Sequence, residues 1–213
     1  MLVSGHLLPS QNKEAQSLLK NLARLEAVVN QNIRMTVYTC LLSALIVVGT
    51  YIKIPVGPVP IVLANFFVIL AGVLLGSKWG TASVAIFLLL GVIGLPVFSQ
   101  GGGVAAIAGP TGGYLIGYLA AAFLTGFITE RGKSKGVFDA VGLVAGALVI
   151  YLLGLPWLKY SLHLTWIKTL SLGLFPFLIG DALKVIAAFA VVRVLQGSAA
   201  SLFPALQGRA TQK

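Results

Sequence analysis

Residues 176–184 read Pro-Phe-Leu-Ile-Gly-Asp-Ala-Leu-Lys and continue directly into the apolar run Val-Ile-Ala-Ala-Phe-Ala-Val-Val at 185–192. This stretch places Asp181 and Lys184 three residues apart within a segment long enough to cross a bilayer. Residues at this spacing share one helix face. Because each charge costs about 3 kcal/mol at the centre of a lipid-facing helix, the pair must face protein or a cavity. Two interpretations stay open: a structural ion pair between helices, and a polar clamp for a small ligand.

The composition predicts an all-α integral membrane protein. Of 213 residues, 58% are hydrophobic and only 9% are charged, against about 25% charged in soluble domains. At about 20 residues per span, the length predicts six transmembrane helices in one bundle, with no room for a soluble catalytic domain. The 15 Lys and Arg against 5 Asp and Glu are scattered, which indicates topology signals and contacts with membrane lipids rather than nucleic acid. The single Cys40 excludes an internal disulfide and a Cys-based metal site.

Polarity divides the chain into three parts. We expect an N-terminal amphipathic arm at 1–34, a transmembrane domain at 35–196 and a short polar tail at 197–213. Within the arm, apolar residues recur at helical spacing, with basic residues elsewhere on the turn; the apolar set is Leu18, Leu22, Leu25 and Val29. The sequence leaves three alternatives open for the arm: a helix on the membrane surface, a partner-binding segment or a solvated leader.

Uncharged runs predict where the six spans lie. The expected ranges are about 35–52, 61–75, 79–95, 113–129, 140–158 and 170–195. We expect Pro176 to break or kink the first turns of the last span. The connector at 53–60 contains three prolines and should be stiff and extended, and the connector at 159–168 carries aromatic residues typical of a membrane interface.

The connector at 99–114 is rich in glycine and has no charge, unlike an ordinary solvated loop. Irregular backbone near membrane depth persists only where protein or a cavity covers it, so we expect this segment to fold back over the bundle. Glycines such as Gly113 would let a ligand approach the backbone, and Tyr114 offers a ring and a hydroxyl. Close helix packing explains the glycines equally. Asn65, at the start of the second span, fits either a bond to a neighbouring helix or a ligand mouth.

Basic residues predict the orientation. With six spans, most Lys and Arg fall on the side of the termini, and the opposite side holds only Lys53, Lys159 and Lys168. The positive-inside rule therefore predicts cytoplasmic termini in the cell membrane. The three longer connectors then face outward, above the level of the Asp181 and Lys184 pair, and predict a pocket that opens outward.

Five segments together resemble the BioY family, the biotin-specific S component of energy-coupling-factor (ECF) transporters. They are Ile-Pro-Val-Gly-Pro-Val-Pro-Ile at 54–61, Leu-Ala-Gly-Val-Leu-Leu-Gly at 70–76, Gly-Val-Ile-Gly-Leu-Pro-Val-Phe at 91–98, Gly-Pro-Thr-Gly-Gly-Tyr-Leu-Ile-Gly at 109–117 and Gly-Asp-Ala-Leu-Lys at 180–184. Their order and spacing carry the resemblance, which covers about 35–196. It implies a six-helix protein that takes up biotin from the outer side. It also implies a transmembrane coupling protein and two ATP-binding subunits as partners, with no ATP hydrolysis, enzyme activity or cofactor of its own.

The resemblance also suggests roles for individual residues. Asp181 would accept the ureido N–H groups of biotin, and Lys184 would donate to the ureido oxygen. Backbone N–H groups near Gly113, with Thr111 or Tyr114, would meet the biotin carboxylate. The resemblance places two further residues in the expected site. Gln100 stands near the position where the family has a polar residue ahead of its glycines. Asn65 lies in a segment where many relatives have a Thr-Leu-Gln pattern instead.

The first span is expected to dock the coupling protein. Cys40 and Ala44 lie four residues apart with Ser43 beside them, so one face should carry only small side chains, which let another helix approach closely. Related S components have an Ala-x-x-x-Ala pattern here that resembles this pair. Packing against a helix of the same chain is the alternative.

Other functional classes fit less well. An intramembrane enzyme lacks support because the expected spans contain one carboxylate and no His-rich set. A self-sufficient small-solute carrier would be expected to show an internal repeat, and none is evident. An S component for another vitamin stays open as an alternative.

Overall fold

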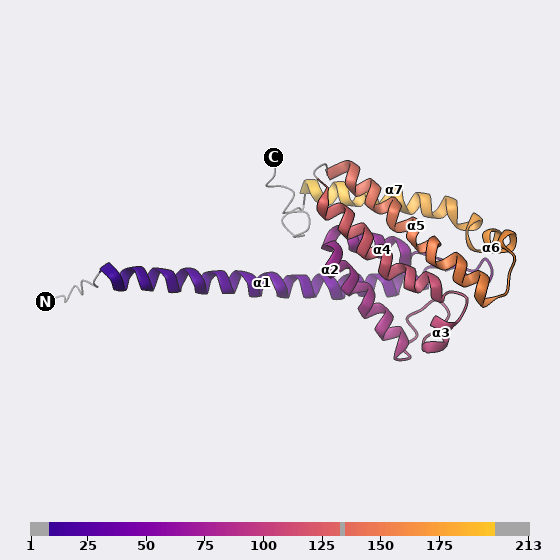
Figure 1. Cartoon of the computed structure of the whole chain (residues 1–213), viewed down its shortest axis with the longest axis horizontal. Helices are drawn as coiled ribbons and strands as arrows, with labels where there is room; N and C mark the ends of the chain where they lie inside the picture. The colour runs from indigo at the N-terminus through magenta and orange to yellow at the C-terminus, as the bar shows by residue number, and fades with distance from the viewer. Residues whose placement is uncertain (1–8, 133–134, 199–213) are drawn as a thin grey trace. The chain divides into compact units, whose positions relative to one another are not determined.

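The computed structural model describes residues 9–132 and 135–198. It divides into two compact units, Met1–Val37 and Tyr38–Lys213. Most of the expected tail at 197–213 lies outside the described residues. In chain order the elements are α1 (Pro9–Tyr51), β1 (Lys53–Ile54), β2 (Ile61–Val62), α2 (Ala64–Val92), α3 (Val104–Ala108), α4 (Gly112–Arg131), α5 (Lys135–Ser161), α6 (Trp166–Gly173) and α7 (Phe175–Ser198) (Figure 1).

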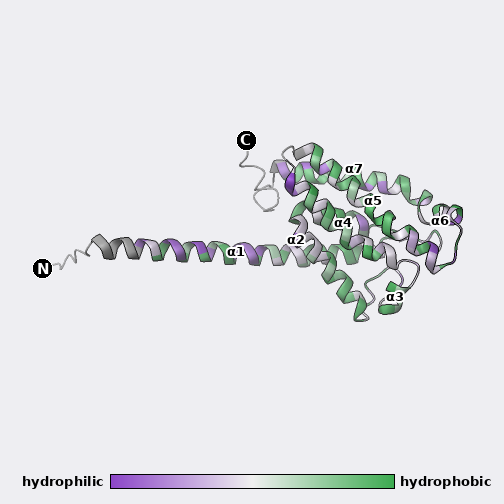
Figure 2. Cartoon of the chain, in the orientation of Figure 1, coloured by the Kyte–Doolittle hydropathy of each residue, from purple (hydrophilic) through white to green (hydrophobic). Residues whose placement is uncertain are grey.

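The first unit is helical from Pro9 onward and belongs to α1. Its residues from 16 to 34 are all exposed. The hydropathy of this part alternates between hydrophilic and hydrophobic, whereas α2, α4, α5 and α7 are mainly hydrophobic (Figure 2). Near the end of the unit, the Thr36 hydroxyl donates to the Asn32 carbonyl at 3.0 Å.

In the second unit, α4 packs most extensively against α2 and α5. Glycine and alanine on α4 allow these close contacts, because small residues let helix backbones approach in a membrane. Gly117, for example, faces the backbone of Ile150 on α5. Fully buried apolar side chains from α1, α2 and α5 fill the space between the helices, among them Ile46, Phe87 and Leu158.

Five described helices are long and apolar enough to span a bilayer: Gln16–Tyr51, Ala64–Val92, Gly112–Arg131, Gly136–Ser161 and Phe175–Gln196. The protein is therefore a multi-pass membrane protein. The five-helix result differs from the expected six because the ranges 61–75 and 79–95 fall in one element, α2. The second expected span also begins later than predicted, because Ile61 and Val62 form strand β2 and helix α2 begins at Ala64.

Helix α2 nevertheless bends sharply at Gly76, whose φ of 82° and ψ of −177° are not helical. The two limbs pack on each other beside the bend, since Gly80 lies against the backbone of Ala71 and Gly72. The carboxylate of Glu130, from α4, accepts hydrogen bonds from the Ser77 N–H at 2.9 Å and the Ser77 hydroxyl at 2.6 Å. It thereby satisfies the free backbone donor at the start of the second limb.

The last expected span, 170–195, is divided. Helix α6 ends at Gly173, Leu174 has non-helical angles, and α7 begins at Phe175. Pro176 then lies in the first turn of α7, where its missing N–H removes no hydrogen bond. Helix α5 is longer than expected and continues through Pro156 to Ser161. Consequently the first residues of the expected connector at 159–168 are helical.

The connectors also have local structure. The proline-rich segment is closed by an antiparallel pair in which Lys53 lies opposite Val62 and Ile54 opposite Ile61. The glycine-rich segment contains the short helix α3 and packs on its neighbours: the Gly103 N–H donates to the Gly91 carbonyl at 2.7 Å. This bond attaches the segment to the end of α2, and its folding back over the bundle stays a prediction.

We predict that Gly76→Ala lowers stability by about 2 kcal/mol, because an L-residue is strained at this φ. In addition, the new Cβ would lie 2.0 Å from Glu130 Oε1 and displace the carboxylate from Ser77. Thermal unfolding in detergent measures the change. Gly136→Ala is the matched control, since its Cβ would meet only an Arg193 side-chain atom at 3.6 Å. Equal midpoints for the two variants would contradict the role of the bend.

Candidate ligand-binding site

Helix α7 supplies the charges of the site. Asp181 and Lys184 fall within the first three turns after its start at Phe175. The Lys184 Nζ lies 2.8 Å from Asp181 Oδ1, and both side chains are 12% exposed. The ion pair expected from the spacing is therefore formed, and it points into the protein. A shielded pair of this kind needs further hydrogen-bond partners to offset the loss of hydration.

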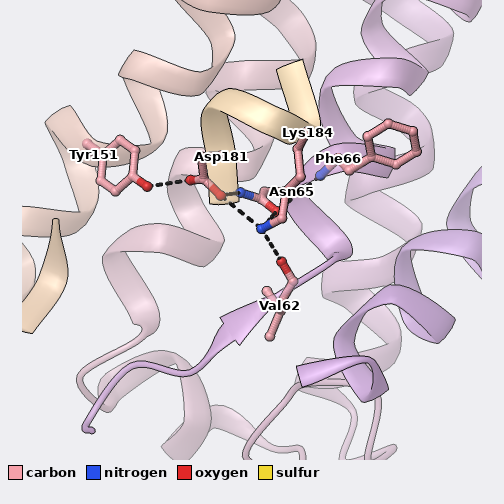
Figure 3. Close-up of polar contacts among 6 residues, drawn as sticks. All are labelled: Val62, Asn65, Phe66, Tyr151, Asp181 and Lys184. Atoms are coloured by element: carbon pink, nitrogen blue, oxygen red, sulfur yellow. Dashed lines mark hydrogen bonds and ion pairs between the residues drawn. The ribbon is translucent and has the colours of Figure 1, made fainter. Parts of the chain in front are cut away.

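Helix α2 and strand β2 supply partners for both charges (Figure 3). The Asn65 side chain donates from Nδ2 to Asp181 Oδ1 at 2.9 Å and accepts from Lys184 Nζ at 3.0 Å. The Val62 carbonyl accepts a further bond from Lys184 Nζ at 2.7 Å. With Asp181, these acceptors occupy all three donors of the ammonium. The remaining amide contact, from the Phe66 N–H to Asn65 Oδ1 at 3.1 Å, fixes the orientation of the side chain.

Helix α5 contributes Tyr151, whose hydroxyl donates to Asp181 Oδ2. Its ring lies edge-on to that of Tyr114, with centroids 6.4 Å apart and an interplanar angle of 87°. Sequence reasoning missed Tyr151 because it is one uncharged aromatic residue in a long apolar run. The available signal was its hydroxyl, since a buried Tyr in a span needs a hydrogen-bond partner.

These side chains line a cavity of about 40 Å³. Its walls come from α1, the β1–β2 connector, α2, α4, α5 and α7, and combine the ion pair with tyrosine rings and aliphatic groups. The lining residues are Thr50, Val59, Pro60, Val62, Asn65, Ser99, Thr111, Tyr114, Leu115, Tyr118, Ile150, Tyr151, Phe177, Asp181 and Lys184. Polar groups that converge in a mainly apolar pocket are typical of a small-molecule site.

Five of the seven expected ligand-binding residues line this cavity, namely Asn65, Thr111, Tyr114, Asp181 and Lys184. The Tyr114 hydroxyl is engaged within the protein, since it donates to the Gly173 carbonyl at 3.0 Å and so connects α4 to α6.

Gln100 and Gly113 do not line it. The exposed Gln100 donates from Nε2 to the Pro58 carbonyl at 2.8 Å and joins the glycine-rich connector to the proline-rich connector. A Cβ on Gly113 would lie 2.3 Å from Cβ of Trp157, so this glycine permits close packing of α4 on α5.

Side-chain bonds hold the connectors beside the cavity. The Thr50 hydroxyl donates to the Val97 carbonyl at 2.7 Å, and Lys53 Nζ donates to the Ser99 carbonyl at 2.5 Å. From α5, Trp157 Nε1 donates to the Gly109 carbonyl at 2.9 Å. The glycine-rich segment is thus attached to the bundle at both of its ends.

The expected docking pair lies on α1. Cys40 and Ala44 are both exposed. Ser43 differs from the expectation: it is 3% exposed and faces the interior. Leu41 and Val48, each 52% exposed, lie beside the pair, both on the Ala44 side around the helix. The face therefore has small residues along one edge and larger aliphatic side chains next to them, and it is not composed only of small residues.

Comparison with known proteins identifies the family. The sequence model of the BioY family matches residues 19–201. The chain belongs to the BioY family. The biotin transporter BioY of Thermotoga maritima is 44% identical over 156 residues, which cover 73% of this chain and 91% of that protein. The probable biotin transporter BioY of Pyrococcus horikoshii is 43% identical over 159 residues, which cover 74% and 93%.

A solved structure agrees with this assignment. The S-component for biotin from an ECF-type ABC transporter superposes with a TM-score of 0.74 at 36% identity, and covers 79% of this chain and 94% of that one. The resemblance seen in the sequence is therefore confirmed. Membership of this family places the chain among transporters and not among enzymes.

We predict that Tyr151→Phe lowers stability by about 2 kcal/mol, because Asp181 loses a hydrogen bond to its charged oxygen. Thermal unfolding without added ligand measures the loss. Tyr160→Phe is the matched control, since Tyr160 is 78% exposed. If Tyr151→Phe unfolds at the same temperature as Tyr160→Phe, the bond to Asp181 does not support the bundle.

Proposed function

We propose that this chain is the biotin-binding S component of an ECF-type transporter and takes up biotin. The observation that carries the proposal is the cluster of Asp181, Lys184 and Asn65 at the wall of the cavity. Relatives named biotin transporters and a solved biotin S-component support the choice of ligand.

The cluster matches the chemistry of a ureido ring. That ring has two N–H donors and one carbonyl acceptor, so a carboxylate and an ammonium side by side complement it. Asp181 accepts from the N–H groups, while Lys184 or Asn65 Nδ2 donates to the ureido oxygen. The ligand replaces bonds that these three residues now make with one another, so the site exchanges hydrogen bonds and exposes no unpaired charge.

The rest of the ligand meets the other walls. The apolar thiophane ring packs on Tyr118, Ile150 and Phe177, and the carboxylate lies toward Thr111 and the backbone of the glycine-rich connector. The cavity of about 40 Å³ holds a few water molecules and is smaller than biotin. Entry therefore requires the outer connectors to move. Gln100 and Gly113 act in this step, through the connector bond to Pro58 and the packing of α4.

We assign six spans, with each limb of α2 crossing the membrane. The bend at Gly76 and the contact of Gly80 with Ala71 support this reading, because the limbs fold back on each other. Lys78 and Arg131 then fall on the same side as both termini, which the positive-inside rule assigns to the cytoplasm. The transmembrane domain is 35–196, with cytoplasmic segments at 1–34 and 197–213.

Transport requires partners in this proposal: a transmembrane coupling protein and two ATP-binding subunits. The exposed face of α1 around Cys40 and Ala44 docks the coupling protein. Its small residues let a partner helix approach closely, and the adjacent Leu41 and Val48 supply apolar contact.

We predict that biotin raises the unfolding temperature of the purified protein, whereas riboflavin and thiamine do not, because a ligand stabilises only the fold that binds it.

Asp181→Asn and Lys184→Met should each weaken biotin binding by at least about 30-fold, since removal of one partner from a desolvated pair costs about 2 to 5 kcal/mol. Calorimetric titration measures the affinities.

Asp139→Asn is the matched control, because Asp139 is fully buried but binds Gln196 Nε2 outside the cavity. It should keep its biotin affinity. Stabilisation by another vitamin would reassign the ligand, and absence of stabilisation at saturating biotin would refute the proposal. If both site variants bound like wild type, the ion pair would be structural.

We predict that Ala44→Trp abolishes co-purification with the coupling protein and ATP-binding subunits but leaves biotin binding intact, because a large ring prevents close helix approach. Leu148→Trp is the control, as Leu148 is 63% exposed on α5. Pull-down of the co-expressed complex, with a titration of the isolated chain, gives both readouts. Loss of biotin binding in Ala44→Trp would instead show that this face packs within the bundle.

A further inference from the structure

The helix of the first unit carries an apolar stripe, with the exposed Leu19 and Val28 on either side of it. Its members are all more than half exposed: Leu18 at 62%, Leu22 at 57%, Leu25 at 62%, Val29 at 54% and Ile33 at 57%. At 3.6 residues per turn these five side chains fall within about a quarter of the helix circumference. Five large aliphatic groups exposed on one side require an apolar environment to cover them.

The opposite side of the same helix is basic. Lys20, Arg24 and Arg34 are exposed and project away from the stripe at helical spacing. Between residues 16 and 34 the single acid is Glu26, which lies at the border of the stripe. The segment thus combines a hydrophobic face with a net positive charge, the pattern of helices that lie in the interface of an anionic membrane.

A second copy of the chain fits this stripe less well. The spacing of Leu18, Leu22, Leu25 and Val29 follows a heptad, but the next two positions of that seam are Asn32 and Thr36. About two apolar heptads remain, whereas coiled coils are recognised from three or four. An anionic lipid surface matches both the stripe and the charge, without any partner sequence.

We propose that residues 16–34 bind the surface of an anionic membrane, with the stripe in the acyl boundary and the basic side chains toward the headgroups. A helix that lies on the surface must turn before the first span. Helix α1 is unbroken from Pro9 to Tyr51, so binding to the surface would bend it near the boundary between the two units, at Val37 and Tyr38. Just before it, Thr36 donates to the Asn32 carbonyl, a side-chain bond of the kind that bends helices.

The test uses the full chain, with Cys40→Ser, in vesicles of phosphatidylcholine alone or with added phosphatidylglycerol. Leu22→Cys places a thiol in the stripe, and Ala27→Cys places one on the opposite side and reports the accessible fraction of the protein. The rate of reaction with a membrane-impermeant maleimide is measured for each. In anionic vesicles Leu22→Cys should react about tenfold more slowly than Ala27→Cys. Replacement of Lys20, Arg24 and Arg34 by Gln should remove most of this protection.

Equal rates for the two thiols in anionic vesicles overturn the proposal. A second outcome also overturns the proposal, in favour of a second copy of the chain. In that outcome the protection of Leu22→Cys does not depend on lipid charge, it increases with protein density, and disulfide-linked dimers form. Because the biotin titration measures a site in the other unit, the same vesicles can show biotin binding while the arm proposal fails, so the two failures are distinguishable.

Discussion

The bundle depends on the hydrogen bonds that surround one ion pair. Lys184 and Asp181 on α7 are bonded to Asn65 of α2, to the Val62 carbonyl of β2 and to Tyr151 of α5. In hydrocarbon an unsatisfied charge is far more costly than in water, so α7 is fixed where its charges find these partners. The same bonds orient the polar groups that face the cavity. The packing of α7 and the ligand recognition proposed above therefore rest on one set of side chains.

Small residues permit this arrangement. The partners of the pair come from distant parts of the sequence, and they meet because α4 holds α2 and α5 close to itself. Gly113 lies against Trp157, and Gly126 lies against the backbone of Ser77. Larger residues at these positions would separate the helices by the width of a side chain. The hydrogen bonds of the site, which need close approach of donor and acceptor, would then not form.

Features that depend on local chemistry could be predicted from the sequence. The spacing of Asp181 and Lys184 predicted their pairing, and apolar composition predicted a helical membrane protein. Tyr151 could not be chosen from the other aromatic residues, because its role depends on which helix α5 faces. The ranges 61–75 and 79–95 placed a break at 76–78, and α2 does bend there, at Gly76. The sequence did not show that a single glycine with positive φ makes the turn between the two helical limbs. Ser43 was wrongly expected on the same exposed face as Cys40 and Ala44. Helical periodicity gives the relative positions of residues around α1, but it does not tell which side of the helix is buried.

The order of the partners along the chain has a consequence for biosynthesis. Val62, Asn65 and Tyr151 all precede α7, which carries both charges of the site. When α7 leaves the ribosome, the groups that hydrogen-bond to Asp181 and Lys184 are already in the membrane. The helix that carries the Asp181 and Lys184 pair therefore enters the bilayer last, after the residues to which the pair will be hydrogen-bonded. An earlier position in the chain would have left the same two charges in lipid until their partners were translated.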